Sequence, residues 1–170
     1  MPVPLPRPGG RRPLAPHPIA LCLLATAGLL AADAAHPAFA AEGWRAAGAR
    51  AAGYAADGNF RAIWLSCEGL PPGRLAIRFS GFPAGLPLDQ AYTVVVSAND
   101  IAFLEETRPV ARAGGGHDLA RTAAFAEFQP MIDALKKGST VEISTPAGRV
   151  ALPLSGSGKA LATLESGCRS

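Results

Sequence analysis

The first 40 residues differ so strongly from the rest that they limit the part of this 170-residue chain that can fold. Seven of the 16 prolines lie in the first 18 residues, together with three arginines. An apolar run over residues 19–32 follows, and residues 38–40, Ala-Phe-Ala, place small side chains at a cleavage site. A basic start, a short apolar run and a small-residue site are the parts of a secretory signal peptide. We therefore expect residues 1–40 to be removed on export.

A membrane anchor is the alternative interpretation of the apolar run. Asp33 ends that run well short of the roughly 20 apolar residues that are needed to span a bilayer. We therefore expect a periplasmic or secreted protein with no stable membrane anchor after cleavage.

The basic charge of the chain belongs largely to this leader. Beyond residue 40, the chain keeps 13 of its 16 basic and 12 of its 13 acidic residues. Lys136-Lys137 is the longest basic run that remains, and it stands where a helix is expected to end, next to the negative end of the helix dipole. A nucleic-acid partner needs a basic stripe that neutralises phosphates, so we expect no nucleic-acid binding.

Two cysteines, Cys67 and Cys168, remain after the leader. Exported proteins meet an oxidising compartment, in which two thiols usually pair. The bridge would close a loop of about 100 residues, for which chain entropy predicts about 4–5 kcal/mol of stabilisation. Two independent free thiols are the alternative.

Alternating apolar residues predict a mainly antiparallel β protein. The first expected strand contains Phe60, Trp64 and Cys67, and the Ala/Gly-rich residues 41–58 before it form either a poorly ordered arm or a weak first hairpin. Residues 108–117 contain three consecutive glycines and are expected to form a flexible loop. Residues 123–128 fit a strand or a helix equally well. The expected strands cover residues 60–67, 75–79, 92–96, 101–105, 141–143 and 150–154.

Two short helices complete the expected fold. Phe128, Met131, Ile132 and Leu135 have the i, i+3, i+4, i+7 spacing of an amphipathic helix, with Pro130 in its first turn. A last helix, begun by Ser155 or Ser157, places Cys168 on its apolar face. The fold class is therefore α+β: a small β-sandwich-like domain over residues 59–170, with about six strands, two helices and one disulfide.

Two short segments carry a resemblance. They are Leu65-Ser66-Cys67 with Leu75-Ala76-Ile77, and residues 152–157, Leu-Pro-Leu-Ser-Gly-Ser, with Ala160, Leu161, Leu164 and Cys168. Together they resemble a group of small exported bacterial β-rich proteins that includes accessory proteins of type VI secretion and proteins like those of invasion-associated locus B. The resemblance implies a role in the bacterial envelope or in host interaction, and it implies no catalytic residue.

The chain offers little for catalysis or metal binding. His117 is the only histidine beyond the leader, and we expect it in a solvated loop. A zinc site needs three or four nitrogen or sulfur ligands, so we expect no metal and no cofactor. Glu105 and Glu106 are adjacent on a strand and point to opposite faces, so we interpret them as a solvated strand end and not as an acid–base pair. Gly114-Gly115-Gly116 lacks the frame of a phosphate loop.

Trp64 is the best candidate for a binding surface. It lies on the strand face opposite Cys67, beside Arg61 and within reach of Arg78, and tryptophan with arginine is typical of interface hot spots. Phe82, in a Gly/Pro-rich segment with Leu86, could extend this surface. The alternative is that Trp64 packs under a helix on the second face of the sheet.

These observations favour a non-enzymatic binding or accessory protein that contacts another envelope or host protein. The alternative hypothesis is an inhibitor of a hydrolase such as a lysozyme or a protease, a role to which small disulfide-bonded β domains are suited. The third hypothesis is an enzyme that uses His117, Glu or Asp.

Overall fold

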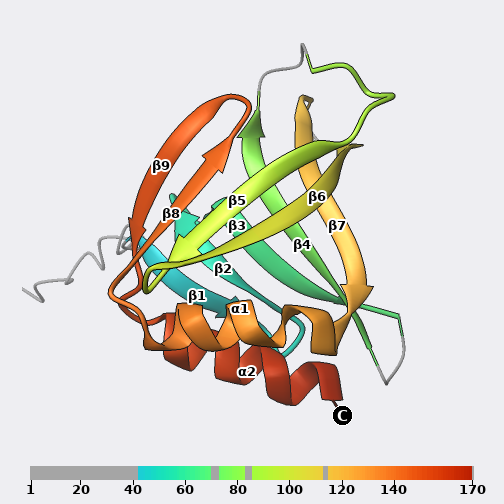
Figure 1. Ribbon diagram of the computed structural model, residues 1–170. Helices are drawn as coiled ribbons and strands as arrows, with labels where there is room; N and C mark the ends of the chain where they lie inside the picture. The colour runs from blue at the N-terminus through green and yellow to red at the C-terminus, as the bar shows by residue number, and fades with distance from the viewer. Residues whose placement is uncertain (1–41, 70–72, 83–85, 113–114, 170) are drawn as a thin grey trace, which may run out of the picture. The chain divides into compact units, whose positions relative to one another are not determined.

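Nine antiparallel strands form one sheet in the part of the chain that the structure describes (Figure 1). The structure is a computed structural model, and it describes residues 42–69, 73–82, 86–112 and 115–169. All of them belong to one compact unit. The predicted signal peptide, residues 1–40, lies outside the described residues and stays a prediction.

The strands are β1 (Gly43–Ala47), β2 (Ala51–Ala56), β3 (Asn59–Glu68), β4 (Arg74–Phe82), β5 (Tyr92–Ala98), β6 (Ile101–Ala111), β7 (His117–Ala124), β8 (Thr140–Thr145) and β9 (Gly148–Pro153). The helices are α1 (Phe125–Lys137) and α2 (Ser157–Arg169).

The strand order is β1-β2-β3-β4-β7-β6-β5-β8-β9, with every neighbour antiparallel. The long strand β6 joins the two halves, because residues 101–107 pair with β5 and residues 108–111 pair with β7. The sheet curls until its edges approach, and the Trp44 indole on β1 donates a hydrogen bond to the Pro153 carbonyl on β9. The expected sandwich is therefore wrong: the fold is a single, nearly closed sheet (Figure 1).

The structure has three strands in addition to the six that the sequence predicts. Residues 41–58 contain the hairpin of β1 and β2, which settles the open choice between arm and hairpin, so regular structure begins before residue 59. The segment expected to be a loop at residues 108–117 contains the end of β6 and the start of β7. Strand β7 was missed because Arg121 occupies a core-facing position, where an apolar residue would have revealed the alternation.

Both helices lie against one end of the curled sheet (Figure 1). The apolar face of α1 is buried as predicted, with Phe128, Ile132 and Leu135 fully inaccessible. However, α1 begins three residues earlier than expected, so Pro130 lies inside the helix. Its ring removes one backbone donor, while the Glu127 carboxylate accepts a hydrogen bond from the Ala124 amide and caps the earlier start.

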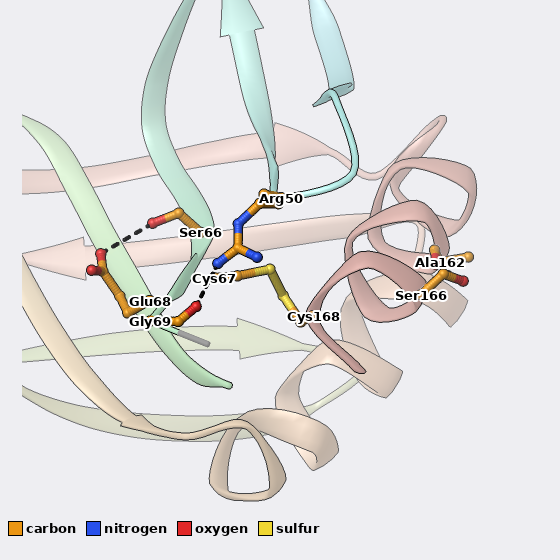
Figure 2. The surroundings of a disulfide bond; sticks show 8 residues. All are labelled: Arg50, Ser66, Cys67, Glu68, Gly69, Ala162, Ser166 and Cys168. Carbon is orange, nitrogen blue, oxygen red and sulfur yellow. Dashed lines mark hydrogen bonds between the residues drawn. A yellow bond between two sulfur atoms is a disulfide. The ribbon is translucent and has the colours of Figure 1, made fainter. Parts of the chain in front are cut away.

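The predicted bridge between Cys67 and Cys168 is present and joins β3 to α2 (Figure 2). The two Cα atoms lie 5.5 Å apart across 101 residues of sequence. The Cys67 amide donates to the Arg50 carbonyl, and the Arg50 guanidinium donates to the Gly69 carbonyl at 2.7 Å beside the bridge. The turn between β1 and β2 is thereby attached to the same corner of the fold.

Candidate binding surface

Two neighbouring rows of residues cross the sheet on opposite faces. The inner row faces the core from β2 to β7 and ends in an exposed residue on β1; it consists of Ala46, Ala52, Leu65, Ile77 and Arg121. The outer row, one residue away on each strand, consists of Arg45, Gly53, Trp64, Arg78, Ala120 and Arg108. Cys67 lies on the inner face, where α2 packs, so Trp64 lies on the face that the helices leave uncovered.

Trp64 is the centre of an aromatic and cationic cluster on the outer face. Phe60 stacks on it with ring centroids 5.7 Å apart and planes inclined by 9°. The Arg78 guanidinium lies 5.2 Å from the centroid of the indole, within range of a cation–π interaction. The indole N–H donates to the Ser80 hydroxyl at 3.2 Å. These contacts hold the ring in one orientation while its side chain stays partly exposed, which lowers the entropy that binding would cost.

Gly53 allows β2 and β3 to approach closely at Trp64. A Cβ atom at this position would collide with Cβ of Trp64 and would lie 2.7 Å from the Ile63 carbonyl oxygen. The absence of a side chain at Gly53 therefore makes room for the backbone and Cβ of the neighbouring strand. Ala62, with φ of 58°, adds a local distortion to β3 between Phe60 and Trp64.

The predicted surface residues are only partly brought together. Arg78 contacts Trp64, whereas the exposed Arg61 pairs with Asp57 at 3.4 Å within its own hairpin. Phe82 belongs to β4, but its side chain lies outside the described residues, so its predicted role stays a prediction. Sequence reasoning missed Arg45 and Arg108, because only the strand register aligns them with Trp64.

A groove of about 750 Å³ opens beside this cluster. Its walls include Tyr54 of β2, Phe60 of β3, Asp118 of β7 and Arg112, which follows β6. The Asp118 side chain is only 7% exposed and lies 3.6 Å from an Arg112 nitrogen, while its Oδ1 makes no hydrogen bond to the described residues. Burial and the neighbouring carboxylate of Glu42 raise the pKa of Tyr54. The groove thus combines aromatic walls with a buried carboxylate.

An ion pair inside the fold replaces the predicted solvated strand end. Glu105 is 5% exposed, and it accepts a hydrogen bond from Arg121 at 2.5 Å. Arg121 also bonds Glu127 at 2.6 Å and lies over the Phe128 ring. The hydrogen bond to Glu105 is the largest of the effects that raise the pKa of Arg121. Glu106 is exposed on the opposite face, as the alternation predicts.

The remaining candidates from the sequence are His117 and the glycines before it. The expectation that His117 lies in a loop is wrong, because it is the first residue of β7. Its buried Nδ1 has no hydrogen-bond partner in the described part of the chain. Gly115 and Gly116 come directly before it, with positive φ angles.

Over the described ranges, no three His, Cys, Asp or Glu side chains are grouped so that they could hold a metal ion. Neither α1 nor α2, the helices of the described part, is long and apolar enough to cross a membrane.

Comparisons with known proteins add little to this geometry. No protein-family model matches the chain, and no curated protein is similar to it. One solved structure, that of invasion associated protein b from Bartonella henselae, is 13% identical with a TM-score of 0.34. The match covers 64% of this chain and 94% of that one. A likeness at this level carries no argument about function.

The disulfide is the clearest indication of the environment. Disulfides persist in oxidising compartments and are rare in the cytosol. The bridge between Cys67 and Cys168 therefore indicates an oxidising, non-cytoplasmic environment for the folded protein.

Proposed function

We propose that this protein is an exported, non-enzymatic binding protein that contacts another envelope or host protein through the outer row around Trp64. The observation that carries the proposal is the orientation of Trp64: the ring is fixed by Phe60, Arg78 and Ser80, yet the helices leave its face of the sheet uncovered. A fixed, partly exposed tryptophan with an arginine beside it has the composition of an interface hot spot. The disulfide supports a periplasmic or secreted location.

Site-specific photocrosslinking in cells that produce the protein tests this proposal. A photoreactive residue at Ala120, which is next to Arg78 in the outer row, is expected to capture one defined partner. Leu104 on β6 is the matched control, because it is 69% exposed and lies outside the outer row. Trp64→Ala is expected to abolish the adduct at position 120, and Trp64→Phe to retain part of it, since the phenyl ring preserves some apolar contact.

Three results would contradict the proposal: no adduct at position 120, the same adduct from position 104, or an adduct that Trp64→Ala leaves unchanged. The hydrolase-inhibitor hypothesis is tested by the same material. It requires that the captured partner is a hydrolase whose activity falls when the purified protein is added.

A further inference from the structure

The arginines at the two ends of the outer row differ from most other arginines of the described chain. Arg61, Arg112, Arg121 and Arg149 each form an ion pair with a carboxylate. Arg45 is partly exposed and Arg108 is exposed. Neither has a carboxylate partner among the residues that the structure describes. The outer row therefore presents positive charge that this part of the chain does not neutralise.

The arginine in the middle of the row has a carboxylate partner, whereas those at its two ends have none among the described residues. Arg78, in the middle of the row, lies 3.7 Å from Glu68, a side chain that is 42% exposed. Glu106 lies two residues before Arg108 on the same strand face, but it forms no ion pair with it among the described residues. Neither Glu68 nor Glu106 therefore pairs with Arg45 or Arg108 in the described part of the chain.

The row has the dimensions of a short peptide. Neighbouring strands are about 4.8 Å apart, so Arg45 and Arg78, three strands apart, are separated by about 14 Å, and Arg78 and Arg108 by about 10 Å. An extended chain advances about 3.3 Å per residue, so about eight residues would cover the row from end to end. Gly53, which is buried, and Ala120, which is partly exposed, are the small residues between the larger side chains of the row.

We infer that the outer row binds an acidic segment of the partner protein, with carboxylates at Arg45 and Arg108 and an apolar side chain against Trp64. This inference rests on the proposed function, since it names the chemistry of the partner at the same surface. Charge complementarity selects an acidic partner, and the central aromatic cluster selects one that also carries an apolar residue. An anionic phospholipid surface would offer negative charge without a defined apolar side chain between the charges.

Fluorescence anisotropy with a labelled 12-residue peptide tests the inference on the mature, disulfide-bonded protein. The peptide carries Glu and Asp on both sides of a central Leu, and the matched peptide carries Gln and Asn at the same positions. The acidic peptide is expected to bind more tightly, and its affinity should fall as salt is added, because exposed charges are screened. The double variant Arg45→Glu with Arg108→Glu is expected to weaken binding by about tenfold or more at low salt.

The control variant is Arg149→Glu, whose side chain is 73% exposed on β9 outside the outer row. It makes the same kind of charge change and is expected to leave the peptide affinity within about twofold, since isolated surface charges contribute little. Circular dichroism and thermal unfolding show that each variant is folded before binding is measured.

Equal binding of the two peptides, or an equal loss with Arg149→Glu, would overturn the inference. So would binding to phosphatidylglycerol vesicles in place of the peptide, because it would assign the charge to a lipid surface. These outcomes are distinct from failure of the proposed function. If Trp64→Ala abolishes the crosslinked adduct while Arg45→Glu with Arg108→Glu preserves it, the protein contact stands and the acidic chemistry is wrong.

Discussion

The inner and outer rows run across the same strands, one residue apart, and they have opposite chemistry. Leu65 and Ile77 of the inner row are fully buried, in a core that both helices and the disulfide enclose. Trp64 and Arg78, their direct neighbours, contact each other on a face without such a cover. Stability is therefore concentrated on one face, and the other face can carry polar and aromatic groups at little cost to the fold.

Breaking the disulfide should cause the largest loss of stability among the changes that compare the two faces. Cys67→Ser with Cys168→Ser is expected to lower the free energy of unfolding by about 4 kcal/mol, because the bridge closes a long loop in the unfolded chain. Denaturant titration with and without reductant measures it. Reductant should destabilise the natural protein to the same extent and leave the double variant unchanged. A loss below about 1 kcal/mol would show that packing of α2 alone holds the inner face.

Leu65→Ala is expected to cost about 3 kcal/mol, because it opens a cavity at a fully buried position. Arg78→Ala, on the next strand but on the outer face, serves as the control and should cost much less. Comparable losses measured by urea unfolding would contradict the division between the two faces.

The sequence predicted the inner face better than the outer one. Apolar alternation in β3 and β4 and the helical spacing of Phe128 and Leu135 identify core positions directly, since burial there follows residue type. The pairing of Cys67 with Cys168 followed from the same two periodicities and the expected export.

The errors have a common physical cause, namely contacts between residues far apart in sequence. Glu105 was interpreted as part of a solvated strand end, but Arg121, 16 positions later in the sequence, forms an ion pair with it inside the fold. The nearly closed sheet depends on the change of pairing partner along β6 and on the approach of Trp44 to Pro153, which no local pattern encodes. Likewise, Trp64 and Arg78 were found by composition, whereas Arg45 and Arg108 required the strand register.

Gly53→Ala tests whether an outer-row position can matter for stability. The new Cβ would collide with the Trp64 side chain and the Ile63 backbone, and overpacking of this kind costs about 1–3 kcal/mol. The double variant Gly53→Ala with Trp64→Ala keeps the Cα and Cβ atoms of residue 64 and the Ile63 carbonyl, so it should relieve none of this collision. Thermal unfolding of both variants measures the cost. If Gly53→Ala alone is neutral, β2 and β3 can separate enough at this point to accept a side chain.

Glu165 on α2 makes the packing over the inner face depend on pH. Burial would raise its pKa, but hydrogen bonds from Lys136 and Gln129 and the charges of Lys136 and Arg169 outweigh burial, so its pKa is lowered in the folded protein. The corresponding stability is present above the pKa of the unfolded chain and is lost as the pH falls through the lowered folded value. Glu165→Gln should cost about 1 kcal/mol at neutral pH and reduce the loss of stability in acid. Asp89→Asn, at an exposed loop residue, is the control; an unchanged acid profile for Glu165→Gln would show that another group titrates.

Arg108→Ala should have the smallest effect on stability. Its side chain is exposed and makes no ion pair with a described residue, so the free energy of unfolding should change by less than about 0.5 kcal/mol. Binding should respond differently, because an unpaired arginine can interact fully with an incoming carboxylate. Urea unfolding and acidic-peptide binding, measured on one preparation, separate the two effects. A large loss of stability would mean that Arg108 supports the pairing of β6 with β7. The outer face would then be part of the fold's own structure and not a surface kept free for a partner.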